Sequence, residues 1–178
     1  MPGKTPEEVL EEARKLIGYE TKPYPIRSPV EYSSILRHCM MTHNDNPLFL
    51  DPEYARNTKY SAVVAPAFFY SVMEGNYRWP GEAKTPEQTL PEVPTPGQRL
   101  INLATEWEIF KPAKIGDSFT ASQRIKDVYT KPTRLDPKSF WIVTERIYRD
   151  QNGETAAICS NIALRYRSPE EIEAAGNA

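Results

Sequence analysis

The sequence is poor in the residues that hold metal ions and form disulfides. It contains two cysteines and two histidines among 178 residues. Cys39 and Cys159 lie in apolar stretches without the close spacing of a metal-binding motif, which favours buried free thiols. The sequence therefore predicts neither a disulfide scaffold nor a metal site.

An excess of charge of one sign and a long apolar run are also missing. The 22 basic and 24 acidic residues give a net charge of -2, so no field attracts nucleic acid or an anionic membrane. No segment approaches the roughly 20 apolar residues that span a bilayer, and the charged start MPGKTPEEVLEEARK is unlike a secretion signal. We expect a cytoplasmic protein whose partners are small molecules or other proteins.

Three helix starts are predicted in the first third of what we expect to be one domain, residues 1–178. TPEE at 5–8 and SPVE at 28–31 each combine a capping hydroxyl, a proline and a glutamate at the spacing of a capping box. The first predicts a helix in an N-terminal extension, residues 1–18. The second predicts an amphipathic helix that ends near Met41. The third start is a cap and first-turn pair, Asp51-Pro52.

The segment SAVVAPAFFYSVMEG is nearly all apolar, which is typical of a helix buried on every side. Pro66 fits its first turn and Gly75 fits its end. Residues 75–98 then contain five prolines and little periodicity, so they predict a long loop insertion. A loop of this length is either functional, as a lid or an interface, or poorly ordered.

The remainder of the chain predicts strands. Apolar residues alternate over 101–109 and 156–166, with partner strands at 117–129 and 138–149. Asn152-Gly153 supplies a tight hairpin turn. Four consecutive strands predict an antiparallel meander, whose apolar face the buried helix covers. The expected class is α+β, a sheet wrapped around one central helix, with a polar tail at 168–178.

The order of these segments resembles the MaoC-like family of hot-dog-fold hydratases and dehydratases over residues 15–167. Its anchors are shared short motifs: Asn46-Pro47, Asp51, Ala55, Ala65-Pro66 and Gly116-Asp117. The resemblance implies a hot-dog fold. It also implies a substrate carried as a thioester of coenzyme A or acyl carrier protein, with no further cofactor.

In catalytic members, an Asp and a His of the loop hold and activate the water. When the family's loop is aligned with THNDNPLFLD, the Asp falls on Asn44 and the His falls on Phe49. Neither residue transfers protons near neutral pH. The resemblance therefore assigns this chain no catalytic residue. It implies the non-catalytic, substrate-binding subunit of a heteromeric enoyl-thioester hydratase or 3-hydroxyacyl-thioester dehydratase, whose second hot-dog subunit carries the intact loop. A homodimer is the alternative assembly.

Two other functions stay open. An autonomous hydratase with a displaced site, or a thioesterase, would use His43 and Asp45 beside Asn44. The third function is a binding module for acyl thioesters without any catalytic partner. His38 is interpreted as an ordinary polar residue of the preceding helix.

The resemblance also implies a set of substrate-binding residues: Asn44, Asn46, Pro66, Ala67, Phe68 and Trp79. Within this set, the backbone amide near Ala67 would polarise the thioester carbonyl. Phe69, Val72 and Met73 fit either an acyl tunnel or the core, and the segment around Tyr77-Arg78 fits a tunnel mouth. Basic side chains at Arg56 and Lys59 fit coenzyme A phosphates or a solvated surface. The stretch VYTKPTRLDPKSFWIVTERIYRDQNGE resembles partner subunits of hydratases that act on steroid side-chain thioesters.

Overall fold

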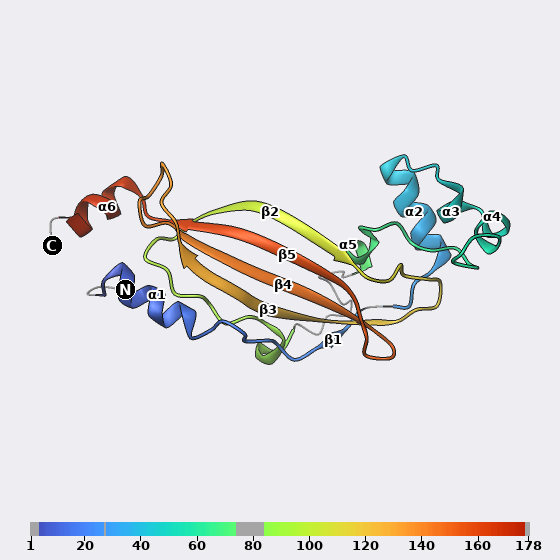
Figure 1. Cartoon of the computed structure of the whole chain (residues 1–178), viewed down its shortest axis with the longest axis horizontal. Helices are drawn as coiled ribbons and strands as arrows, with labels where there is room; N and C mark the ends of the chain where they lie inside the picture. Colours follow the sequence, from blue (N-terminus) through green and yellow to red (C-terminus); the bar gives the residue numbers. More distant parts are fainter. Residues whose placement is uncertain (1–3, 27, 74–83, 177–178) are drawn as a thin grey trace.

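In the part of the chain that the structure describes, six helices and a 3₁₀ turn accompany a long antiparallel sheet, with most helices at its two ends (Figure 1). The computed structural model describes residues 4–26, 28–73 and 84–176. Helix α1 spans Pro6–Arg14. The Thr5 hydroxyl accepts the backbone N–H of Glu8, and the Glu8 carboxylate accepts that of Thr5 at 2.8 Å, so the first predicted capping box is confirmed.

The second capping box is wrong, because helix α2 spans Tyr32–Thr42 and its N-cap is Glu31, which makes no side-chain capping bond. Val30 is buried and exchanges backbone hydrogen bonds with the turn at Gly116 and Asp117, each 2.9 Å long. These bonds hold the SPVE segment in an extended conformation. Tertiary pairing therefore overrides the local signal.

The sheet contains all four predicted strands and one short additional strand. They are β1 (Tyr24–Pro25), β2 (Arg99–Ile109), β3 (Phe119–Thr130), β4 (Phe140–Asp150) and β5 (Thr155–Tyr166). Gly153 adopts φ +80° in the predicted β4–β5 hairpin turn.

The predicted meander is wrong for one strand. The spatial order is β1-β3-β4-β5-β2, so β2 pairs with β5 instead of β3. The free edge of β3 is taken by residues 18–26: the N–H of Gly18 donates to the Ile125 carbonyl at 2.8 Å, and Tyr24 pairs with Ala121. With that edge filled, β2 pairs along the opposite edge of the sheet.

Two apolar clusters hold these elements together. The larger lies beneath α2 and α5 and includes Ile35, Tyr70 and Tyr148. The smaller packs Val9 and Ala13 of α1 onto the other end of β3 and β4. Cys39 and Cys159 are both buried, as predicted, and belong to the larger cluster.

The apolar helix is present as α5, Phe69–Met73, and begins three residues after Pro66. Residues just before it are held extended, because the N–H of Ala65 donates to the Ala113 carbonyl at 2.7 Å and Val64 bridges to Lys114. Its predicted end at Gly75 lies outside the described residues. Phe69 and Tyr70 are buried, so the α+β class with an apolar helix against the sheet is confirmed.

The described part of the predicted loop, residues 84–98, contains the 3₁₀ helix η1 (Pro86–Gln88). Leu90 and Val93 pack against the smaller cluster, so this stretch covers part of the apolar core beside α1. The C-terminal segment forms helix α6, Pro169–Gly176, and the Ser168 hydroxyl accepts the N–H of Glu171 at 3.2 Å.

A buried ion pair joins the β3–β4 connection to the end of β5. The Arg167 guanidinium donates to both carboxylate oxygens of Asp136, at 2.9 and 2.7 Å, and the Arg167 N–H adds a third bond at 3.0 Å. Burial alone would raise the pKa of Asp136, but these bonds lower it to about 2.

Candidate functional site

The loop that carries the family-like motif begins with an abrupt reversal at the end of α2. His43 occupies the left-handed region at φ 51°, ψ 38°, and the N–H of Asn44 donates to the Cys39 carbonyl at 2.9 Å. This geometry ends the helix in the way a C-terminal glycine does. The His43 side chain is exposed, as is that of Asp45.

Asn44 serves the turn through its side chain. Its amide oxygen accepts the backbone N–H of Asn46 at 3.2 Å. Asn46 in turn caps helix α3, Pro47–Leu50, by accepting the N–H of Leu48 at 3.0 Å. Two consecutive Asx-type bonds therefore shape this stretch.

Phe49, where the sequence resemblance places the family's histidine, is half-buried and packs against the larger apolar cluster together with Leu48 and Leu50. The Tyr32 hydroxyl fixes the same stretch by donating to the Leu50 carbonyl at 2.5 Å. A phenyl ring at this position is therefore part of the core.

Helix α4, Pro52–Arg56, follows and confirms the predicted cap. The Asp51 carboxylate accepts the N–H groups of Glu53 and Tyr54, at 2.8 and 3.1 Å. Asp51 thus has a structural role. The basic side chains Arg56 and Lys59 are exposed beyond it, and their predicted contact with phosphates stays a prediction.

A series of contacting aromatic side chains connects α5, and the residue before it, to the sheet. Phe68, 58% exposed, meets Trp107 of β2 edge-on at 6.1 Å, and Trp107 stacks on Tyr148 at 5.8 Å. Tyr70 packs against Tyr148 at 5.3 Å and donates its hydroxyl to the Lys111 carbonyl at 2.7 Å. Burial raises the pKa of Tyr70, so its hydroxyl stays a donor.

Two further predicted binding residues lie just before α5. Pro66 is buried, and Ala67 lies exposed in the turn between Pro66 and α5. Trp79, Tyr77 and Arg78 lie outside the described residues.

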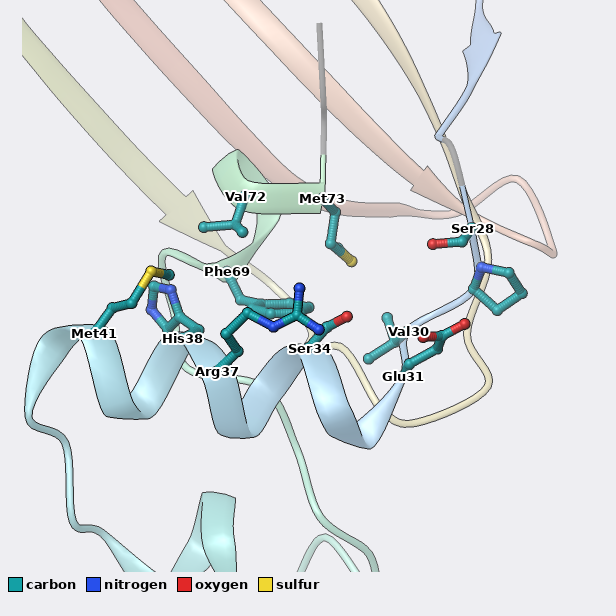
Figure 2. A pocket seen from close by; sticks show the side chains of 11 residues that line it. Ser28, Val30, Glu31, Ser34, Arg37, His38, Met41, Phe69, Val72 and Met73 are labelled. Carbon is teal, nitrogen blue, oxygen red and sulfur yellow. The ribbon is translucent and has the colours of Figure 1, made fainter. Parts of the chain in front are cut away.

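A cavity of about 260 Å³ lies between α2 and α5 (Figure 2). Phe69, Val72 and Met73 line it, and their predicted role beside an acyl tunnel stays a prediction. Arg37 and His38 face them from α2. Among the described residues, its lining includes neither the predicted loop residues nor the turn at 66–68.

The sequence interpretation treated His38 as an ordinary polar residue of its helix, whereas the structure places it in the lining of this cavity. Its imidazole lies edge-on to the ring of Phe69, with centroids 5.7 Å apart. The helical spacing of Ser34, His38 and Met41 was the available signal, since all three fall on one face of α2.

Within residues 4–26, 28–73 and 84–176, no group of three or more His, Cys, Asp or Glu side chains is placed to hold a metal ion. No helix in the described part of the chain is long and apolar enough to cross a bilayer. Burial raises the pKa of the Cys39 thiol, which disfavours its thiolate.

Comparison with known proteins gives three findings. A family model described as "FAS1-like, dehydratase domain region" matches residues 15–159. The probable enoyl-CoA hydratase alpha subunit of Thermomonospora curvata is 31% identical over 150 residues, which cover 78% of this chain and 46% of that protein. The present chain thus spans about half the length of that relative.

Solved structures share the fold. A chain of the ChsH1-ChsH2 complex from Mycobacterium tuberculosis superposes with a TM-score of 0.71 at 16% identity, covering 92% of this chain and 97% of that one. A chain of the C-terminally truncated HadBC complex, a 3R-hydroxyacyl-ACP dehydratase of the same organism, superposes with a TM-score of 0.59 at 17% identity, covering 84% and 96%.

Proposed function

The chain belongs to the family of FAS1-like dehydratase domain regions, and on that premise we propose that it is the non-catalytic, substrate-binding subunit of a heteromeric hydratase or dehydratase. The expected hot-dog fold and the likeness to MaoC-like hydratases and dehydratases are confirmed. The proposal adds the division of labour, in which a second hot-dog chain supplies proton transfer.

One observation carries this proposal: both loop positions that hold acid and base in catalytic relatives have structural roles here. The Asn44 amide stabilises the turn to Asn46, and the Phe49 ring packs into the core. Neither side chain titrates near neutral pH. The loop keeps its shape while its proton chemistry is assigned to the partner.

The proposed interface is the free edge of β2. Among the described residues, β2 pairs only with β5, which leaves the other edge of this 11-residue strand unpaired. Such an edge is a template for pairing with another chain. Leu100, Leu103 and Phe110 are 44–52% exposed along it, which adds apolar surface for a partner.

This interface would also cover the proposed thioester-binding surface. Phe68 contacts Trp107 of β2, so the turn before α5 lies beside the edge strand. A partner paired with β2 would meet Phe68, and Ala67 would present its backbone amide to the thioester carbonyl. The acyl group is proposed to be bulky and steroid-like, supported by the resemblance of residues 128–154.

Three similar proteins support a heteromeric assembly. The structures with TM-scores of 0.71 and 0.59 come from two-chain complexes, and the curated relative is named an alpha subunit. The partner of this chain is proposed to be a shorter hot-dog hydratase with an intact Asp and His loop, encoded beside it.

The test is an assay of enoyl-coenzyme A hydration with the purified chain alone and with that neighbouring hydratase. We expect no turnover by the chain alone and turnover by the co-purified complex. Turnover by the chain alone that is lost in His43→Ala or Asp45→Ala would establish the autonomous enzyme instead. Release of free thiol by the chain alone, lost in Asp45→Asn, would establish a thioesterase.

A further inference from the structure

The cavity between α2 and α5 has an apolar base. Phe69 is 1% exposed and closes the bottom, while Val72 and Met73 project toward it from α5 (Figure 2). Its volume of about 260 Å³ corresponds to roughly nine water volumes. It therefore fits a small ligand with a short apolar portion.

The opposite wall is polar and comes from one face of α2. Ser34, Arg37 and His38 project from the helix on the side that faces α5 (Figure 2). Within the described part of the chain, the Arg37 guanidinium has neither an ion-pair nor a hydrogen-bond partner, and the His38 ring meets that of Phe69 edge-on. Arg37 is exposed and directs its donors toward the cavity, and both ring nitrogens of His38 lack a hydrogen-bond partner among the described residues.

We propose that this cavity binds a compact monocarboxylate, with Arg37 and His38 at the carboxylate and Phe69, Val72 and Met73 around a short alkyl tail. A guanidinium matches a carboxylate with two parallel hydrogen bonds. The tail gains free energy by covering the apolar base. Polar and apolar parts of the cavity thereby select an amphiphilic ligand.

Glu31 makes the choice of anion specific. Its carboxylate also lines the cavity, near Ser28, and its neighbouring hydroxyl donor, Ser33, lies 3.4 Å away. One guanidinium opposed by one carboxylate favours a ligand with a single negative charge. The second charge of a phosphate dianion would gain attraction from Arg37 and repulsion from Glu31 together, so it would add little affinity over a monocarboxylate.

This site goes beyond the proposed function, because a free carboxylate is not a thioester and its binding requires no partner chain. Binding is measured with the full chain by isothermal titration calorimetry. The probes are octanoate, the uncharged octanol and octyl phosphate. We expect saturable binding of octanoate, and at least about tenfold weaker binding of octanol, as the loss of a charge-assisted bond predicts.

Two variants with opposite expected effects on octanoate binding make the test specific. Arg37→Gln should weaken octanoate binding about tenfold or more, whereas Glu31→Gln should strengthen it. Arg134→Gln is the matched control, because Arg134 is an exposed arginine of the β3–β4 connection outside the cavity. Circular dichroism checks that each variant folds. If Arg37→Gln does not fold, the increase in octanoate affinity of Glu31→Gln tests the inference by itself.

The inference is overturned if octanoate shows no saturable binding, if octanol binds equally well, or if Arg37→Gln and Arg134→Gln behave alike. Stronger binding of octyl phosphate than of octanoate would also contradict it. None of these results depends on hydratase activity. Failure of this site therefore leaves the proposed function standing, and the reverse also holds.

Discussion

The amide oxygen of Asn44 lies 3.2 Å from the backbone nitrogen of Asn46 and accepts its hydrogen bond. The side chain on which the sequence resemblance places the family's acid thus stabilises the loop. An aspartate would make the same bond, so the loop needs an oxygen acceptor at this position but no titrating group.

This relationship predicts a stability effect without a catalytic one. Asn44→Ala should lower the free energy of unfolding by about 1 kcal/mol, because the N–H of Asn46 loses its acceptor. Asn44→Asp should keep it. Urea denaturation of the isolated chain measures both, with Asp45→Ala as the exposed control. Equal stability of Asn44→Ala and wild type would show that the bond does not hold the loop.

Phe49 should behave as a core residue. Phe49→Ala should cost about 2 kcal/mol, less than the 3–5 kcal/mol typical of a fully buried phenylalanine, because the ring is half-buried. Tyr54→Ala, at a 50% exposed aromatic of α4, is the control with a smaller expected loss. A loss at Phe49 no larger than at Tyr54 would contradict the packing role.

Much of the fold follows from local sequence signals. The Thr5 capping box, the Asp51 cap, the four strand ranges and the positive φ of Gly153 all act over a few residues, and each is found. Local signals for a helix start do not predict the structure where the same residues form backbone hydrogen bonds with a distant segment. Ser28 does not cap a helix, and α5 begins after Pro66, because Val30 and Ala65 form backbone bonds with the distant segment 113–117.

The candidate site is less predictable for the same reason. The sequence indicated only that Asn44 and Phe49 are not proton-transfer groups. It did not predict the contacts that the two side chains make. The cavity at His38 depends on how α5 faces α2, which no local pattern determines. Likewise, β2 pairs with β5 because residues 18–26 occupy β3, a competition between segments far apart in the chain.

The buried pair of Asp136 and Arg167 predicts a pH dependence. The folded pKa of Asp136 is lowered from its ordinary 3.8 to about 2, so the folded state binds this proton less tightly than the unfolded chain. Its contribution of roughly 2 kcal/mol is fully present above about pH 4 and is lost as pH falls through 2.

The comparison of wild type with Asp136→Asn isolates this carboxylate from other acidic groups with lowered pKa values, such as Glu145. Urea denaturation between pH 5 and 2 should show that wild type loses about 2 kcal/mol more than the variant. Parallel losses would mean that Asp136 does not titrate in this window.

The free edge of β2 predicts which surface substitutions disrupt assembly. Leu103→Glu should reduce binding of the neighbouring hydratase by at least about tenfold, since it places a charge in an apolar interface. Leu135→Glu is the matched control, because Leu135 is similarly exposed, 47% against 44%, in the β3–β4 connection. Size-exclusion chromatography with light scattering measures the complex. Equal binding by both variants would place the interface elsewhere.

The most direct test of the division of labour is turnover by the reconstituted complex with substitutions placed on one subunit at a time. Changing the loop Asp or His of the partner to Ala should abolish hydration, by at least about a thousandfold for loss of the acid–base pair. His43→Ala and Asp45→Ala in this chain should leave kcat within about twofold, since neither transfers protons to substrate. Retained activity with the partner's loop disabled, together with loss in His43→Ala or Asp45→Ala, would contradict the account.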